Sequence, residues 1–263
     1  MEYYRQFYLC FKNLEIVNTC VHNLTWSHIR RIMNEADPKA REWYLKEASE
    51  QMWSVRTLSR NIGTQYYGRR MASYREHLTL PKPIIEENDP QEYVKSPVIA
   101  EFLGFRKDSK FDESELEQAL INNLEQFIME LGRGFAFVDR QKHIITDTAD
   151  YYIDLVFYNI KLKRYVLFEL KTHELTHQDV GQLDMYVRMY DDLVKDDSDN
   201  PTIGILLCTN TDKTIAKYSV LHNSEQLFAS KYMAYMPTEE ELRRAIEEQK
   251  RFFLEQHEKG NSE

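Results

Sequence analysis

The 263-residue sequence has few cysteines, no repeats and no long apolar segment. Its three cysteines, Cys10, Cys20 and Cys208, have no CxxC or zinc-ligand spacing, which argues against a disulfide framework and a structural zinc site. No apolar run approaches the roughly 20 residues of a membrane helix. The first residues also lack the basic-then-apolar order of a signal peptide, and they begin abruptly in an aromatic helical pattern, as in a divergent or shortened N-terminus. We therefore expect a soluble, cytoplasmic protein with no membrane contact.

Positive charges are outnumbered by negative ones, and the net charge is -9. The two signs are unevenly distributed along the chain. Residues 1–83 contain 13 Lys+Arg against 8 Asp+Glu, whereas residues 84–263 contain 21 against 35. This asymmetry predicts a basic module that handles a polyanion and an acidic module that holds a cation. The alternative is that acidic loops and a charged C-terminal helix only keep the second part hydrated. Charge alone leaves both interpretations open.

Residues 1–83 are predicted to form an all-helical N-terminal module. N-cap residues precede three short amphipathic segments, and the second segment also begins with proline. Three such helices are compatible with a helix-turn-helix-like module whose last helix enters the major groove, although an ordinary solvated face has the same pattern. The N-caps are Thr25, Asp37 and Ser54. The outward residues of the third helix are Arg56, Ser59, Arg60 and Asn61, and the predicted nucleic-acid contacts are Arg56, Arg60, Arg69 and Arg70.

Residues 84–110 are the predicted linker, because prolines and acidic residues interrupt any helix, with VIAEFLGF as a segment that docks elsewhere. Residues 111–240 then follow the order helix, three strands, helix, strand, which predicts an α/β domain with a mixed sheet. Residues 241–263 are expected to form a C-terminal helix and tail. The expected elements are a helix over 112–132, strands over 135–141, 151–158 and 164–171, a helix over 177–194 and a strand over 201–209.

The segment DYYIDLVFYNIKLKRYVLFELK brings acidic residues to the ends of two apolar strands. Side chains alternate along a strand, so Glu169 and Lys171 share a face and Leu170 points to the opposite layer. With Asp154 they offer hard oxygen ligands and an amine, which indicates a Mg²⁺ site for phosphodiester hydrolysis, with Mn²⁺ as a substitute. The Leu170 carbonyl is a further ligand, and Lys171 is expected to act on the attacking water or the phosphate charge. Glu117, beside the buried stripe of the preceding helix, completes the predicted metal ligands.

The pattern D-x14-ExK across consecutive strands resembles the PD-(D/E)XK nuclease superfamily, and in particular its YhcG-type bacterial proteins. The similar segments include LTWSHIRRIM, LEQALINNLEQFIMELGRGFAFVDRQ, YYIDLVFYN, YVLFELK and GQLDMY. The resemblance implies a restriction-endonuclease-like core of helix, three-stranded meander, helix and strand. It implies that Gln182, which with Tyr186 matches a QxxxY pattern, joins Asp154, Glu169, Lys171 and Glu117 in catalysis. Glu113 or Glu115 could replace Glu117, and Ile153 stands where the family pattern has proline. Arg140 and Tyr186 are further candidate nucleic-acid contacts.

The predicted function is therefore Mg²⁺-dependent cleavage of nucleic acid, with DNA favoured over RNA. Because duplex cleavage needs two sites, a homodimer is one expected arrangement, and a restriction or defence-system protein is another candidate partner. The alternative is a nuclease-fold protein without activity that serves as a nucleic-acid-binding or assembly module. ExK at a strand end is also a common surface ion pair, so those two residues alone do not separate the alternatives.

Overall fold

The computed structural model describes residues 2–11, 20–72, 98–107, 110–146, 149–222, 224–235 and 237–257. The chain divides into two compact units, Met1–Arg69 and Arg70–Glu263. The predicted module boundary at residue 83 and residues 84–97 of the predicted linker lie outside the described residues, so these boundaries stay predictions.

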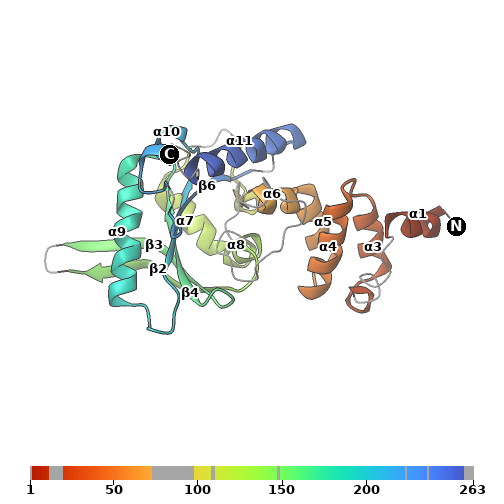
Figure 1. The fold of residues 1–263 in the computed structure, drawn as a ribbon, viewed down its shortest axis with the longest axis horizontal. Helices are drawn as coiled ribbons and strands as arrows, with labels where there is room; N and C mark the ends of the chain where they lie inside the picture. Colours follow the sequence, from red (N-terminus) through yellow and green to blue (C-terminus); the bar gives the residue numbers. More distant parts are fainter. Residues whose placement is uncertain are drawn as a thin grey trace, which may run out of the picture. The chain divides into compact units, whose positions relative to one another are not determined.

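The helices that follow Thr25, Asp37 and Ser54 begin where the sequence predicts (Figure 1). Asp37 accepts a hydrogen bond from the backbone N–H of Lys39, and Ser54 accepts one from that of Thr57. Both bonds satisfy amides that the first helical turn leaves unpaired. The elements are α1 (Glu2–Cys10), η1 (Val21–Asn23), α3 (Trp26–Met33), α4 (Pro38–Glu50), α5 (Val55–Gly63) and α6 (Tyr66–Ala72), whose last residues belong to the second unit.

The core of the first unit joins α3, α4 and α5 through fully buried Ile32, Leu45 and Leu58. Asn61, near the end of α5, is also buried, so the prediction that it faces outward is wrong. The hydroxyl of Tyr44 on α4 donates a hydrogen bond to the Asn61 carbonyl (3.1 Å), which holds this end of α5 against the core.

The second unit is organised by a six-stranded mixed sheet in the order β1-β6-β5-β4-β3-β2. The meander β2-β3-β4 is antiparallel, whereas the pairs β4–β5, β5–β6 and β6–β1 are parallel. The strands are β1 (Val98–Ile99), β2 (Phe135–Ile145), β3 (Asp150–Asn159), β4 (Arg164–Leu170), β5 (Ile203–Cys208) and β6 (Leu227–Met233). The helices are η4 (Glu101–Leu103), α7 (Glu113–Asn122), α8 (Leu124–Leu131), α9 (His177–Leu193), α10 (Lys213–Tyr218) and α11 (Glu239–His257).

Two apolar cores lie on the two faces of this sheet. On one face, α7 and α8 bury Leu120 and Phe127 against Phe157 and Phe168. On the other, α9 buries Leu183 against β4 and β5, and Phe252 of α11 joins the same core. The layered α/β architecture with a mixed sheet is the predicted fold class.

Three features of the second unit differ from the sequence prediction. The single helix expected over 112–132 is two helices, because Asn123 leaves helical geometry and its side chain donates to the Ala119 carbonyl. Residues 98–103 of the predicted linker form β1 and η4, consistent with a docked segment. Strand β6 and helix α10 were not predicted, because their short segments carry no clear periodicity.

Candidate active site

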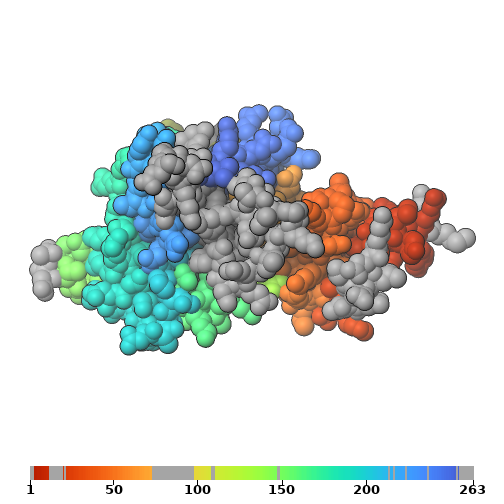
Figure 2. Space-filling model, viewed as in Figure 1, coloured from red at the N-terminus to blue at the C-terminus, as the bar shows by residue number. Residues whose placement is uncertain are grey.

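Strands β3 and β4 separate at Asp154, and two carboxylates occupy the point of separation. The last paired residues of the ladder are Leu155 and Phe168. Beyond them the Leu170 N–H donates to Asp154 Oδ2 (2.8 Å), and the Asp154 N–H donates to Glu169 Oε1 (3.4 Å). Hydrogen bonds to these two side chains therefore replace the next backbone pairs between β3 and β4. We call this arrangement of Asp154, Glu169 and the Leu170 N–H the strand fork. Beyond it, β3 continues with β2 as a hairpin that projects from the sheet (Figures 1 and 2).

Lys171 lies directly after the fork, at the end of β4. Its Nζ is 3.6 Å from Glu169 Oε2, and the Leu170 side chain packs in the core beneath α7 and α8, as the strand alternation predicts. Lys171 Nζ is also 3.8 Å from Glu113 Oε2 on α7. The amine thus lies between two carboxylates and is itself buried.

Gln141 on β2 links the fork to α7, a contact that the sequence does not predict. Its Nε2 donates both to Glu117 Oε2 (2.6 Å) and to Asp154 Oδ1 (3.1 Å). Gln141 has a φ of 46°, which is uncommon for a residue with a side chain. Such a conformation turns the residue out of the regular strand pattern, and no sequence signal predicts it. One amide group therefore joins two carboxylates from different elements.

The three glutamates of α7 have different roles. Glu117 is buried, and its Oε1 is 3.6 Å from Arg140 Nε, in addition to the bond from Gln141. Glu115 caps its own helix through the Asp112 N–H, which removes it as the alternative to Glu117. Glu113 also accepts a hydrogen bond from the Thr172 N–H (3.4 Å). Two helix glutamates, four residues apart, therefore approach the fork.

The QxxxY pair forms a unit of its own on α9. Gln182 Nε2 donates to the Tyr186 hydroxyl (2.8 Å), while Tyr186 packs in the core beneath that helix. Burial raises the pKa of Tyr186, the hydrogen bond from Gln182 lowers it, and the charges of Glu169 and Asp154 raise it again. Because the ring is buried, the structure corrects the prediction that Tyr186 contacts nucleic acid.

The arginines predicted to contact nucleic acid also differ in exposure. Arg69 is fully buried, and its guanidinium donates to the carbonyl and hydroxyl of Thr64, so its role is structural. Arg70 is buried as well, and the prediction of nucleic-acid contact is corrected for both. Arg56 is exposed, Arg60 is partly buried, and Arg140 is directed to Glu117 and Gln118.

The carboxylates of the fork have perturbed acidities. Burial, and then the charge of Asp154, raises the pKa of Glu169 to about 8. Burial also raises the pKa of Asp154, despite the bond from the Leu170 N–H. Burial lowers the pKa of Lys171, but the charges of Glu169, Glu113 and Asp154 outweigh this and raise it overall. The fork therefore favours a proton or a cation between its carboxylates, and it keeps Lys171 protonated.

These residues fit a hard divalent cation in part. Asp154 and Glu169 provide the carboxylate oxygens that Mg²⁺ prefers, and their mutual repulsion is what a cation would relieve. Within the described segments of the chain, no group of three acidic, histidine or cysteine side chains is arranged to hold one ion. Asp154 and Glu169 are thus the two carboxylates that the fork offers to a cation, and Glu117 is linked to Asp154 through Gln141.

A cavity of about 610 Å³ has Thr172, the residue after Lys171, in its lining. Four basic side chains line this cavity, together with Thr209 and the aromatic ring of Phe111. The basic residues are Arg106, Lys107, Lys110 and Lys231. Two of these cations have acidic partners, since Lys107 pairs with Glu241 and Lys231 Nζ lies 3.9 Å from Glu248 Oε2.

Residues 91–247 match the family described as "YhcG PDDEXK nuclease domain". The chain belongs to this nuclease family. Residues 1–69 match the "DUF1016 N-terminal domain". A curated member, "Putative nuclease YhcG" of Escherichia coli (strain K12), is 33% identical over 214 residues, which cover 81% of this chain and 56% of that protein. The match thus spans little more than half the length of the curated relative.

Two solved structures resemble about half of this chain at low similarity. The first is titled "crystal structure of a repair endonuclease from Pyrococcus abyssi", with 20% identity, coverage of 47% and 48% of the two chains, and a TM-score of 0.30. The second is titled "Structure of EndoMS-dsDNA2 complex", with 22% identity, coverage of 51% and 49%, and a TM-score of 0.33. Separately, no helix in the described part of the chain is long and apolar enough to cross a membrane.

Proposed function

We propose that this YhcG-family protein is a divalent-metal-dependent nuclease that hydrolyses phosphodiester bonds, with DNA as its substrate. The strand fork is the observation that carries the proposal. The fork holds two desolvated carboxylates next to a protonated lysine. Basic side chains line a cavity in the same unit. Family membership supports the reaction class, and the basic cavity supports a polyanionic substrate.

Each residue of the site has a proposed role. Asp154 and Glu169 hold Mg²⁺, or Mn²⁺ in its place, with the Leu170 carbonyl as a further ligand. When bound, the cation supplies positive charge at the scissile phosphate and a more acidic water. Lys171 remains an ammonium ion and donates to the attacking water or a phosphate oxygen, since the surrounding carboxylates raise its pKa.

The remaining residues position this group. Gln141 keeps Glu117 and Asp154 at a fixed separation through its two hydrogen bonds. Glu113 holds the far side of Lys171, and Gln182 orients the Tyr186 hydroxyl near the fork. Buried neighbours of this kind limit the movement of reacting groups, which lowers the reorganisation needed in the transition state.

The proposal also includes the type of organism, the cellular location and the partners of the protein. The curated relative is from Escherichia coli, which supports a bacterial protein, and a cytoplasmic location is part of the same proposal. One fork cuts one strand, so pairing of two copies would serve duplex cleavage, and a restriction or defence-system partner is a further proposal.

A plasmid-cleavage assay tests the function. We expect the purified chain to nick or cut DNA with Mg²⁺ and to stop when EDTA is added. Asp154→Asn, Glu169→Gln and Lys171→Met should each lower the rate by at least about 100-fold, because each removes a group that acts on the metal or phosphate. Glu247→Gln and Lys250→Met, at exposed positions of α11, are matched controls and should cut at the wild-type rate.

Undiminished cutting by all three fork variants would contradict the assignment. Absence of cutting in every metal, together with metal-independent DNA binding, would favour the inactive nucleic-acid-binding alternative. Parallel reactions with single-stranded, duplex and branched DNA and with RNA would identify the substrate class.

A further inference from the structure

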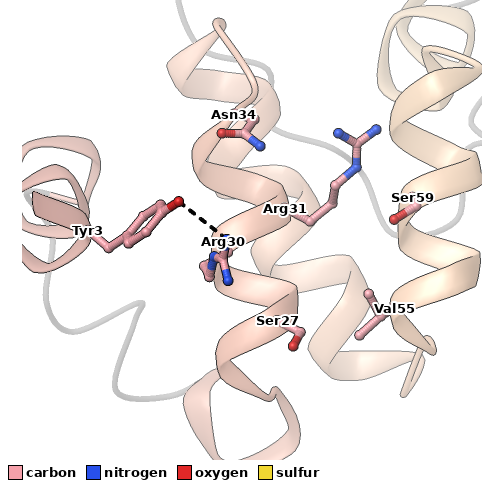
Figure 3. A pocket seen from close by; sticks show the side chains of 7 residues that line it. All are labelled: Tyr3, Ser27, Arg30, Arg31, Asn34, Val55 and Ser59. Carbon is pink, nitrogen blue, oxygen red and sulfur yellow. Dashed lines mark hydrogen bonds between the residues drawn. The ribbon is translucent and has the colours of Figure 1, made fainter.

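A basic cleft lies in the first unit, outside the candidate active site. It has a volume of about 300 Å³ and lies between α3 and α5, with Tyr3 of α1 at its edge (Figure 3). Two arginines and two serines provide most of its hydrogen-bond donors. We call this site the α3–α5 cleft. Its polar lining residues are Tyr3, Ser27, Arg30, Arg31, Asn34 and Ser59.

Arg31 is the central residue of the cleft. Its side chain extends from α3 toward α5, and its Nε is buried without a hydrogen-bond partner (Figure 3). No acidic side chain in the described part of the chain lies within ion-pair distance of Arg31. Because Arg31 lines the cleft and has no acidic partner there, an anion in the cleft can accept hydrogen bonds from the terminal amino groups of its guanidinium.

The neighbouring side chains add donors around the same space. Arg30 donates to the Tyr3 hydroxyl (3.4 Å) and lies 4.5 Å from the centre of its ring, which directs its guanidinium to the cleft mouth. Ser27 and Ser59 make no hydrogen bond through their hydroxyls within the described residues. Figure 3 shows Ser27 on α3 and Ser59 on α5.

The charge of the walls favours an anion strongly. Helix α3 contains Arg30 and Arg31 and helix α5 contains Arg56 and Arg60, but neither contains an aspartate or glutamate. Guanidinium groups bind phosphate in a bidentate manner, and hydroxyls supply additional donors to its other oxygens. The cleft is open, so a phosphate that belongs to a polymer can enter it without being enclosed.

We propose that the α3–α5 cleft binds a backbone phosphate of nucleic acid, with Arg31 as the main contact and Arg30, Ser27 and Ser59 as supporting donors. The choice of a nucleic-acid phosphodiester over a free phosphate ion rests on the proposed nuclease function. The sequence predicts a nucleic-acid contact at Arg56 and Arg60 on the outer face of α5. The proposed contact lies instead in the groove between α5 and α3.

Binding of a short labelled DNA duplex to the full chain in EDTA tests this site without any cleavage. Arg31→Gln should raise the Kd about tenfold and reduce the slope of log Kd against log salt by about one, because one phosphate contact is lost. Ser27→Asp should raise the Kd at least as much, since it places a carboxylate in the cleft. Aspartate in the first turn of α3 is favourable for the helix, so this variant should fold.

Lys39→Gln is the matched control, because it removes one positive charge from an exposed position on α4 outside the cleft. Its Kd should stay within about twofold of wild type. Circular dichroism and thermal unfolding establish that each variant is folded.

Wild-type affinity in folded Arg31→Gln and Ser27→Asp would overturn the proposal. A loss confined to Arg56→Gln would overturn it in favour of the outer face of α5. Stabilisation of the wild type by inorganic phosphate, without any effect of Arg31→Gln on the DNA Kd, would limit the cleft to a free phosphate ion and overturn the nucleic-acid assignment. Binding is measured in EDTA, so the result does not depend on cleavage. DNA can bind in the α3–α5 cleft of a protein that does not cut DNA, and a protein that cuts DNA can lack this contact.

Discussion

Glu169 is the residue for which the structure predicts the largest pH-dependent effect on stability. Its pKa is raised from 4.5 to about 8, chiefly by burial and then by the charge of Asp154. The folded state therefore binds the proton more tightly than the unfolded chain does. Stability from this group is fully present below pH 4.5 and is lost as the pH rises through about 8.

Glu169→Gln tests this reasoning, because glutamine has the shape of the protonated acid and does not ionise. One pKa unit corresponds to about 1.4 kcal/mol, so ionisation of Glu169 costs the folded state at most about 5 kcal/mol. The pKa of about 8 already includes the attraction of Lys171; partial entry of water reduces the cost further, and we expect about 2 kcal/mol. In EDTA the variant should match the wild type near pH 5 and be more stable by about 2 kcal/mol at pH 9.

Urea unfolding at several pH values measures the difference, with Glu247→Gln as a control at an exposed position. Addition of Mg²⁺ at pH 8 should stabilise the wild type and have little effect on Glu169→Gln, since the cation replaces the proton as partner of the carboxylates. A stability difference that is constant with pH, or that falls as pH rises, would refute the raised pKa. A Mg²⁺ effect of equal size in both proteins would refute Glu169 as a ligand.

Two further predictions concern single contacts. Gln141→Ala removes the amide that joins Glu117 to Asp154, and it should lower DNA cleavage about 10-fold while changing the free energy of unfolding by only about 1 kcal/mol. The exposed Gln126→Ala is its control in the same cleavage assay, and equal rates would remove Gln141 from the site. Gly204→Ala should destabilise the fold by about 1 to 3 kcal/mol in urea unfolding, because the added Cβ would lie 2.7 Å from Leu183 Cγ. Gly181→Ala on α9 meets nothing within 4 Å and should leave the stability unchanged or raise it, so equal losses in both variants would contradict the close packing.

Much of the fold could be predicted from local patterns. Capping residues such as Asp37, Ser54 and Thr176 locate helix starts, because their side chains satisfy amides in the first turn. The unbroken apolar run of β5 predicts a strand covered on both faces, and all six of its residues are buried. The break at Asn123 was missed, because an apolar stripe continues from α7 into α8 and only the packed structure shows where the backbone leaves the helix.

The candidate site was predicted in part. The strand alternation correctly placed Glu169 and Lys171 on one face. By contrast, the arginine-rich pattern near the end of the first unit predicted exposed cations, whereas Arg69 is fully buried against Thr64. A sequence shows that a residue is charged, but whether a guanidinium is solvated depends on helices that are distant along the chain.

For this protein, the sequence alone determined the elements that local physics controls: the helix starts, the strand alternation and the order of elements in the α/β domain. The tertiary structure decided which groups meet. Asp154 and Glu169 replace backbone rungs only because β3 and β4 separate at that point, and Gln141 reaches Glu117 only because its backbone turns out of β2. Such contacts join residues far apart in sequence, so their energies depend on the assembled fold and have no local signature.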